Sequence, residues 1–574
     1  MGHRTLKRRN IRRATVKTVA LGCCLAIWLV APATDSVAQE QEEMFTTTIV
    51  VTTASDSNPD SITRTCGYAS GIYMFDENEP CSLRRAMVEA SARPTVDRPI
   101  LIRFEIPETE AEQFNADLGT WTISLGARLK LSRENTLETL GQVTIEGVER
   151  PIPDDMMPMQ GEMPPEEMRG GPAIILETND FPIEIESSNN TLRHFLIKGG
   201  GILQLKDDAA ETLLEYNWFG LSDDGQTLAI ANENNERGLS GSGGILVQSD
   251  MSVIRHNVAA GFTTRAIDVT GDTNVIDSNW IGTRSDGTVP DVNIRIQCLR
   301  SFTFEPLNWY GGWGIRVSGD GNMITNNILA GLHQTQSETE TPPMAIEVFG
   351  INHTISGNQI GVDTNGIVIA DDGSLNVPGV CGGGIKSGGT ANRIVANTLA
   401  DTKVFFPADE GNPGGAILIT DSSPLFDQLT MQENVVINGP GLAMEFGPSI
   451  PMTLRAFPTP VITGMTVDAV AETTTIIGNA GLCEACRIDF YLDDFDGMPD
   501  ANQEALAWIG YVEVNVPPGG NTDFTVVVDA VLPEGLGVRT NATTLFPAII
   551  GSFGTGTSTV LSGDLYLIPA PVMP

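Results

Sequence analysis

Four charged residues, two acidic and two basic, occupy the same position in short apolar segments. Each stands at the middle of a three-residue unit that begins with isoleucine, so strand alternation turns it outward. In chain order they are Asp268, Arg316, Glu347 and Lys386. If these segments stack, charges of alternating sign form one column. The column predicts either an exposed ion-pair ladder or a lyase site, in which the two acids hold a cation on a uronate while Arg316 or Lys386 removes the α-proton.

The segments belong to an internal repeat of five copies. Each copy has an isoleucine, an inward-facing residue two positions later, an apolar residue nine positions after the first, and an asparagine three positions beyond that. The first and last residues of the copies are Ile245 and Asn257, Ile267 and Asn279, Ile315 and Asn327, Ile346 and Asn358, and Ile385 and Asn397. Weaker copies flank them, at Leu214 with Asn217 and at Met431 with Asn434. This pattern predicts a right-handed parallel β-helix.

The shortest distance between copies is 22 residues, which equals one coil of a three-strand solenoid. The other distances, 48, 31 and 39 residues, imply excursions outside the coil or an unmarked extra coil. In stacked coils like residues recur about 4.8 Å apart, so we expect isoleucines to stack inside and asparagines to form a ladder at a bend. A helix capped by Ser82 and running to about Ala92 would cover the first coil.

The first 38 residues read as a cleaved secretory signal: a basic start, an apolar run from Val19 to Val30, and small residues before Gln39. Twelve apolar residues are too few to cross a bilayer. We therefore expect a secreted or surface-associated protein with no membrane span in the mature chain. Cleavage leaves 27 basic and 71 acidic residues, a net charge of −44, which argues against nucleic acid as a partner. We expect a monomer.

Six cysteines remain after cleavage, and in the oxidising compartment that a secreted protein reaches they are expected to form disulfides. Cys66 and Cys81 would close a 15-residue loop, and Cys483 and Cys486 form a C-x-x-C without a second such pair, which favours a local disulfide over zinc. By elimination, a disulfide between the two remaining cysteines, Cys298 and Cys381, is the third predicted pair.

Aromatic residues crowd the long excursion before Ile315. Trp309, Tyr310 and Trp313, with two phenylalanines nearby, could form a platform for sugar rings, or could pack the loop onto the coil. The sequence leaves both interpretations open.

An acidic loop lies in the C-terminal part of the chain. Asp494, Asp496 and Asp500, followed by Glu504, place oxygen ligands around a glycine turn. Calcium is the one cofactor that the sequence suggests, and a plain acidic hairpin loop is the alternative.

Two groups of motifs resemble a known family. Cys81-Ser-Leu-Arg-Arg-Ala86 is similar to the N-terminal CSLREA segment of bacterial exported β-helix proteins, but has Arg85 where glutamate is usual. The bends at 279–287 and 358–366 resemble the repeats of the same proteins. The resemblance covers roughly residues 48 to 450 and implies a pectate-lyase-like scaffold, without assigning a reaction.

These observations divide the chain into a signal peptide (1–38), an N-terminal cap segment (39–110), a β-helix (111–450) and a small antiparallel β-sandwich-like domain (455–574). The sandwich is predicted from strands at 473–477, 486–492, 508–514 and 522–528. We expect a protein that binds extended polysaccharide along one face. The alternatives are a polysaccharide lyase, a glycoside hydrolase using paired carboxylates, and a structural or adhesive surface protein.

Overall fold

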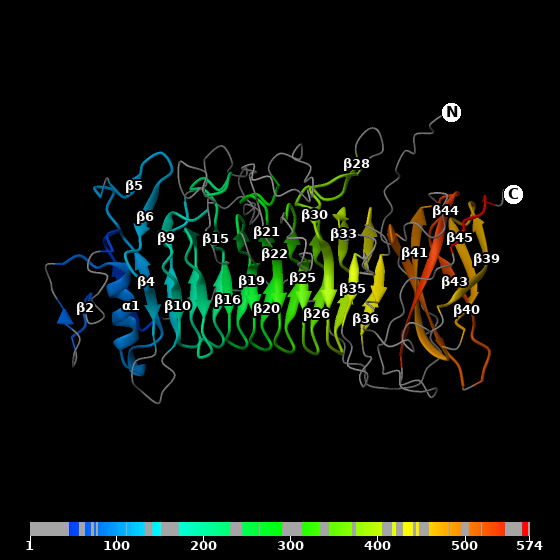
Figure 1. The fold of residues 1–574 in the computed structure, drawn as a ribbon, viewed down its shortest axis with the longest axis horizontal. Helices are drawn as coiled ribbons and strands as arrows, with labels where there is room; N and C mark the ends of the chain where they lie inside the picture. Colours follow the sequence, from blue (N-terminus) through cyan, green and yellow to red (C-terminus); the bar gives the residue numbers. More distant parts are fainter. Residues whose placement is uncertain are drawn as a thin grey trace, which may run out of the picture.

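The fold is an all-β solenoid closed at both ends (Figure 1). The computed structural model describes residues 45–56, 64–69, 74–75, 79–110, 112–132, 141–150, 171–229, 244–262, 265–289, 313–332, 344–369, 375–403, 416–420, 429–439, 443–446, 459–481, 483–494, 504–517, 519–545 and 565–571. The predicted right-handed parallel β-helix, with its capping helix and its C-terminal antiparallel domain, is confirmed.

Three long sheets, here called A, B and C, form the sides of the solenoid. Sheet A contains β1 (Thr47–Val51), β4 (Ile100–Phe104), β8 (Val143–Glu146), β11 (Thr191–Arg193), β14 (Leu213–Glu215), β17 (Val253–Arg255), β20 (Val275–Asp277), β23 (Met323–Thr325), β26 (Thr354–Ser356), β32 (Arg393–Val395) and β36 (Thr430–Gln432). Sheet B contains β5 (Phe114–Asn115), β6 (Thr120–Ser124), β9 (Ile174–Glu177), β12 (Phe195–Lys198), β15 (Trp218–Phe219), β18 (Val258–Ala259), β21 (Trp280–Ile281), β24 (Ile328–Leu329), β27 (Gln359–Ile360), β33 (Thr398–Ala400) and β37 (Val435–Ile437). Sheet C contains β7 (Leu129–Leu131), β10 (Ile183–Ile185), β13 (Leu203–Leu205), β16 (Ile245–Val247), β19 (Arg265–Val269), β22 (Trp313–Val317), β25 (Met344–Val348), β31 (Gly383–Ser387), β35 (Ile417–Ile419) and β38 (Met444–Phe446).

Neighbouring strands within these sheets are parallel, except that β5 pairs antiparallel with β6 at one end of sheet B. Four short strands pair outside the sheets: β2 (Arg64–Thr65) with β3 (Met74–Phe75), and β30 (Val380–Cys381) with β34 (Thr402–Lys403). A hairpin of β28 (Val368–Ile369) and β29 (Leu375–Asn376) projects from the edge drawn uppermost in Figure 1.

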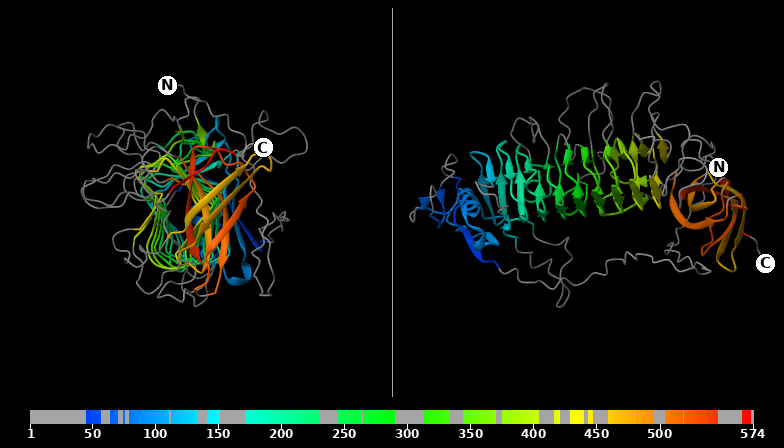
Figure 2. Two further views of the ribbon diagram at one scale, coloured as in Figure 1. Left: turned by 90° about the vertical axis from the view of Figure 1, so that its right-hand side faces the viewer. Right: turned by 90° about the horizontal axis from the view of Figure 1, so that it is seen from below.

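Stacked aliphatic side chains fill the solenoid. The isoleucines that define the repeat in sheet C are at most 2% exposed, and those of sheet A are fully buried from Ile254 to Ile394. Because each coil places the same residue type over its predecessor, the stack is one continuous core running along the axis. End-on, the strands of successive coils superpose (Figure 2).

An asparagine ladder runs along the bend between sheets A and B, as predicted. Its seven members are Asn217, Asn257, Asn279, Asn327, Asn358, Asn397 and Asn434, none more than 1% exposed. In each step the backbone N–H and the side-chain amide of one asparagine both donate to Oδ1 of the next, at 2.9 to 3.1 Å. The amide also donates to a carbonyl one coil back, so the ladder satisfies backbone groups that the bend would otherwise leave unpaired.

A second ladder, at the bend between sheets C and A, was missed by the sequence analysis. The backbone N–H of Ser252 donates to Asn274, that of Asn274 to Asn322, that of Asn322 to Nδ1 of His353, and that of His353 to Asn392. His353 is fully buried and stands where the neighbouring coils have asparagine. Its Nε2 lies 3.1 Å from the carbonyl of Phe349. Nδ1 must therefore accept and Nε2 donate, which requires the neutral imidazole.

His353 is expected to make stability pH-dependent. Burial lowers the pKa of His353, against the opposing effect of the Asp320 and Asp272 carboxylates. The folded state therefore takes up a proton on this ring only at a lower pH than the unfolded chain, which binds one below about pH 6.5. The contribution of the neutral ring to the free energy of unfolding is therefore fully present at pH 8 and becomes smaller as the pH falls to 5. We expect His353→Asn to remove it. Melting curves at both pH values test this, and parallel pH profiles for the two proteins would contradict it.

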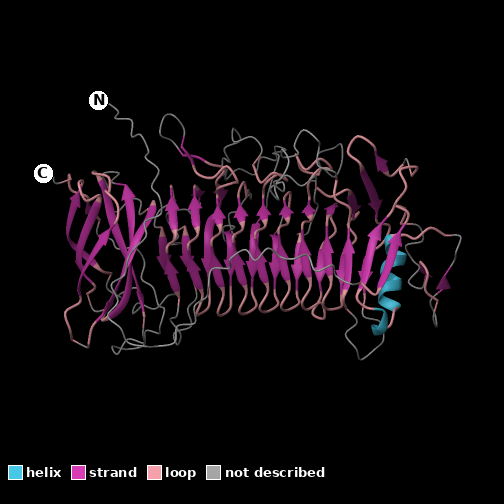
Figure 3. Cartoon of the chain, turned by 180° about the vertical axis from the view of Figure 1, so that it is seen from behind, coloured by secondary structure: helices cyan, strands magenta, loops and turns pink. Residues whose placement is uncertain are grey.

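The predicted helix α1 (Leu83–Ala92) covers the first coil, and a short 3-10 turn, η1 (Thr95–Asp97), follows it (Figure 3). Ser82 caps the helix by accepting from the Arg85 backbone N–H at 3.4 Å. Leu83, Ala86 and Met87 are buried in the solenoid core cluster. The helix therefore closes the open end of the core.

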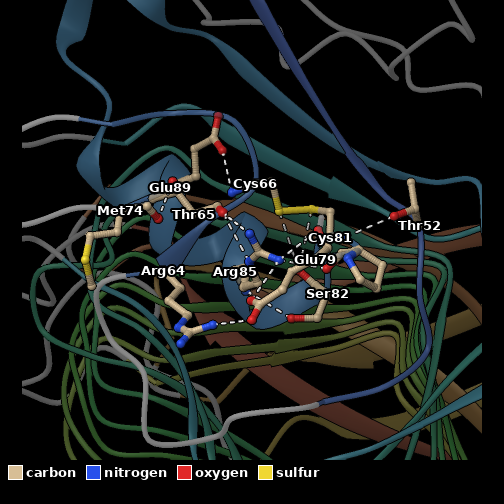
Figure 4. Close-up of polar contacts among 11 residues, drawn as sticks. Thr52, Arg64, Thr65, Cys66, Met74, Glu79, Cys81, Ser82, Arg85 and Glu89 are labelled. Carbon is tan, nitrogen blue, oxygen red and sulfur yellow. Dashed lines mark hydrogen bonds and ion pairs between the residues drawn. A yellow bond between two sulfur atoms is a disulfide. The ribbon is translucent and has the colours of Figure 1, made fainter. Parts of the chain in front are cut away.

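Arg85, where the resembled segment has glutamate, anchors the cap loop (Figure 4). Its guanidinium donates to the backbone carbonyls of Thr65, Glu79 and Pro80. A carboxylate could make none of these bonds. The Cys66–Cys81 disulfide joins the same loop to the start of the helix.

The C-terminal domain consists of two antiparallel sheets. One contains β39 (Val461–Asp468), β40 (Thr473–Asn479) and β43 (Asp523–Val528), and the other contains β41 (Ala485–Asp494), β42 (Ala507–Asn515), β44 (Leu536–Thr544) and β45 (Tyr566–Leu567). A shared core that includes Ile476, Phe490 and Val526 lies between the sheets. The Cys483–Cys486 pair forms a disulfide. The pairing of Cys298 lies outside the described residues.

This domain closes the far end of the solenoid. Tyr491, on the face of β41 opposite Phe490, is fully buried and belongs to the solenoid core cluster. Val436 and Ala505 exchange backbone hydrogen bonds of 2.9 and 3.0 Å. Arg487 lies 2.6 Å from Glu433 of the last coil. Among the helices of the described part of the chain, none is long and apolar enough to cross a membrane.

Candidate functional site

The predicted charge column exists on the outer face of sheet C. Register pairs Leu246 with Asp268, Asp268 with Arg316, Arg316 with Glu347, and Glu347 with Lys386. These strands are hydrogen-bonded neighbours, so the long spacings between copies are excursions and not unmarked coils. The column continues into apolar Leu418 on β35.

From β15 to β35 the long excursions leave the solenoid at one corner. The long connections from β15 to β16, β21 to β22, β24 to β25, β27 to β31 and β33 to β35 all run from sheet B to sheet C. From β10 to β33 the connections at the other two bends are short, whereas β8 on sheet A and β9 on sheet B are separated by residues 147–173. In the part of the solenoid that carries the five-copy repeat, sheet C is therefore the sheet that begins after each long insertion. Insertions on one face of a repeat protein commonly lie at its binding surface.

Only part of the column forms ion pairs. Lys386 Nζ lies 2.8 Å from Glu347 Oε1, and Arg265 Nη1 lies 3.3 Å from Asp268 Oδ2. Although Arg316 stands between Asp268 and Glu347 in register, it forms an ion pair with neither. The predicted ladder is thus interrupted at Arg316, leaving its cation without a carboxylate partner among the described residues.

The guanidinium of Arg316 instead lies beside an aromatic ring. Its Cζ is 5.6 Å from the centroid of Phe349, and Lys386 Nζ is 5.3 Å from the same ring. Nε of Arg316 and Oδ1 of Asp268 are buried without a hydrogen-bond partner. We call the outward side chains Arg265, Asp268, Arg316, Glu347, Phe349 and Lys386 the Arg316 face. It combines an aromatic ring with a guanidinium that has no carboxylate partner among the described residues, and these are groups that bind an anionic sugar.

Phe349 was not among the predicted binding residues. The signal that could have found it is its place two residues after Glu347, which turns it to the same side of the sheet.

The lyase interpretation requires a basic side chain able to accept a proton. The amine of Lys386 is already engaged as a donor to Glu347 at 2.8 Å, which turns it toward that carboxylate and away from a proton on a bound sugar. Glu347 is 8% exposed and is already used in this pair. The geometry therefore favours binding over proton abstraction by Lys386.

The predicted aromatic platform is only partly described. Trp313 is the first residue of β22, in register with Arg265 on sheet C. Trp309 and Tyr310 lie outside the described residues. Stacking of sugars on these three residues stays a prediction.

The predicted calcium loop is also only partly described, since Asp496 and Asp500 lie outside the described residues. Oxygens of Asp493, Asp494 and Glu504 come within 4.8 Å of one another. Asp493 is already paired with Arg539, and Glu504 accepts from the Asn438 backbone N–H at 2.8 Å. Calcium binding stays a prediction.

A second charge column, missed by the sequence analysis, lies on sheet A. Arg193 is 2.9 Å from Glu146 and 3.5 Å from Glu215, and Arg255 is 2.7 Å from Glu215. Beside it, Tyr216 stacks between His194 and His256 with ring centroids 5.6 and 5.2 Å apart. Both arginines of this column have carboxylate partners, which distinguishes it from the Arg316 face.

Comparisons with known proteins give no family. No protein-family model matches the chain, and no curated protein matches it. Among solved structures it is similar to tailspike protein 2 of Escherichia coli O157:H7 bacteriophage CAB120, with 10% identity and a TM-score of 0.19 over 64% of this chain and 61% of that one. A mutant tailspike protein of E. coli bacteriophage HK620 gives 8% identity and a TM-score of 0.22, over 72% and 86%. It is also similar to a Geobacillus virus E2 protein, with 8% identity and a TM-score of 0.18 over 70% of this chain and 72% of that one. The first match spans less than two thirds of that tailspike's length, and likenesses this low carry no argument about activity.

Proposed function

We propose that this protein binds an extended polysaccharide along the Arg316 face, without needing to cleave it. The observation that carries the proposal is Arg316 itself, a half-buried cation that has no carboxylate partner among the described residues and lies beside the Phe349 ring. A ligand supplying an acidic group and a sugar face would satisfy both side chains. A solenoid gives such a chain a straight, repeating surface.

The signal-like first 38 residues and the disulfides support secretion or surface association. The similarity to CSLREA-type exported β-helix proteins supports the same proposal. Sequencing the N-terminus of the protein recovered from its producing cells tests it, with Gln39 expected as the first residue. A chain that still begins before residue 30 would contradict cleavage.

The ligand is tested with a glycan array, using wild type, Arg316→Gln and Arg393→Gln. Arg393 is an exposed arginine on sheet A and controls for loss of one positive charge. We expect at least one acidic glycan to bind, and Arg316→Gln to weaken it by about tenfold, since a charge-assisted hydrogen bond contributes about 1.5 kcal/mol or more. Arg393→Gln should bind as wild type.

A parallel assay follows reducing ends and unsaturated products, each with and without calcium. Product formation that Lys386→Ala abolishes would replace the binding proposal with a lyase. Absence of any bound glycan would overturn the proposal.

A further inference from the structure

Arg316 differs from the other basic residues of sheet C because no carboxylate lies beside it. Five further basic side chains lie on the described strands of this sheet or directly next to them, and each has a carboxylate oxygen at 2.7 to 3.9 Å. They are Arg128, Lys130, Lys206, Arg265 and Lys386. Among the described residues of sheet C, Arg316 is therefore the one cation whose charge no neighbouring carboxylate balances.

The two carboxylates that flank Arg316 in register are used in such pairs. Asp268, one coil before it, lies 3.3 Å from Arg265. Glu347, one coil after it, lies 2.8 Å from Lys386. A close pair of opposite charges has no net charge and exerts little force on a distant anion. The column is thus one positive charge between two neutral pairs.

The molecule as a whole is strongly acidic. Its net charge is −38, or −44 without residues 1–38, and a field of this sign repels a polyanion. One acidic sugar is attracted by Arg316, whereas each further acid on the same chain meets only neutral pairs on sheet C and the repelling field around them. Phe349, whose ring centroid is 5.6 Å from Cζ of Arg316, provides an apolar surface for the sugar ring that does not depend on charge.

We propose that the Arg316 face binds a single acidic sugar within an otherwise neutral polysaccharide, and that it does not favour polyuronates. This inference rests on the proposed function and specifies its ligand class. The planar guanidinium is suited to bind a carboxylate through two parallel hydrogen bonds. The neutral sugars on either side of the acid would lie over Phe349 and over the neutral pairs.

The test uses hexasaccharides with one common backbone, carrying no uronate, one uronate at an inner position, or uronates throughout. Calorimetry at low and high salt measures their affinities. Wild type should bind the singly acidic hexasaccharide about tenfold more tightly than the neutral one, and the fully acidic one no more tightly than the singly acidic one. Because salt screens attraction and repulsion alike, added salt should weaken binding of the singly acidic ligand and strengthen that of the fully acidic one. Arg316→Gln should bind the neutral and the singly acidic ligands equally.

Glu347→Gln is expected to change this preference. The substitution leaves the Lys386 amine without its carboxylate, which adds an unbalanced cation to the face. Affinity for the fully acidic hexasaccharide should therefore rise by about fivefold or more. Asp268→Asn, which removes the carboxylate beside Arg265, should act in the same direction. Glu513→Gln removes an exposed acid of the C-terminal domain, far from sheet C in the sequence, and is the control for net charge.

The outcomes separate the two levels of the proposal. If none of the hexasaccharides and no array glycan binds, the proposed function fails. If wild-type affinity rises with every added uronate, or if the neutral and singly acidic ligands bind wild type equally, the single-charge inference is wrong and the binding function stands. The same holds if Glu347→Gln and Asp268→Asn melt as wild type does and leave the affinity for the fully acidic ligand unchanged. Should neither variant fold, the wild-type series decides the question by itself.

Discussion

Replacing Asn327 by alanine is expected to lower the free energy of unfolding by about 4 kcal/mol. Asn327 stands in the middle of the asparagine ladder, and its Oδ1 accepts both N–H groups of Asn279 at 2.9 and 3.0 Å. Its amide donates to the Ile276 carbonyl and to Asn358. The substitution leaves several of these buried groups without partners, and each costs about 1 to 3 kcal/mol.

Chemical denaturation measures this effect, with Asn326→Gly as the matched control. Asn326 is the exposed residue just before Asn327, with φ of 55°, a conformation that glycine adopts without strain. One coil further on the same place is already glycine, Gly357. The control should change stability by less than about 1 kcal/mol. A loss of that small size for Asn327→Ala would show that the ladder contributes little.

The second large effect is expected at the junction with the C-terminal domain. Tyr491→Ala removes a fully buried ring from the end of the solenoid core and should cost about 3 to 5 kcal/mol, as large-to-small aromatic substitutions do. Because the ring belongs to the core of the last coil, we expect that coil to open along with the domain. Hydrogen exchange in β36 and β37 should therefore quicken.

Tyr566→Ala is the control for this experiment. Tyr566 is half-buried against the core of the C-terminal domain and has no place in the solenoid cluster. It should weaken the domain without changing exchange in β36 and β37. Unchanged exchange in the Tyr491 variant would mean that the domain is an appendage and not a cap.

The solenoid could be predicted because stacking repeats one environment in every coil. In each copy the first isoleucine points inward from a strand of sheet C. The apolar residue nine positions later points inward from the next strand, on sheet A, and the asparagine three positions beyond it lies in the bend that follows. The second ladder escaped because its positions are filled by serine, asparagine and histidine, so no single residue type recurs. Hydrogen bonding, not residue identity, is what that bend conserves from coil to coil.

Two further features lay beyond sequence reasoning. Strand β44 was missed because it is buried on both faces, so it lacks the alternation that identifies a half-buried strand. The column of charged residues on sheet C was predicted, but which of them form ion pairs depends on the side-chain conformations. Arg316 lies against Phe349, which follows Glu347 on the neighbouring strand, and spacing alone does not reveal that contact.

The central claim is that polysaccharide lies on the Arg316 face, and hydroxyl-radical footprinting tests it most directly. The half-buried Phe349 reports on that face, and Met323, which is 43% exposed on sheet A, is an internal control. With a glycan that binds on the array present at saturation, we predict that oxidation of Phe349 falls by about threefold or more while that of Met323 is unchanged. Equal protection of both residues, or protection of Met323 alone, would contradict the account.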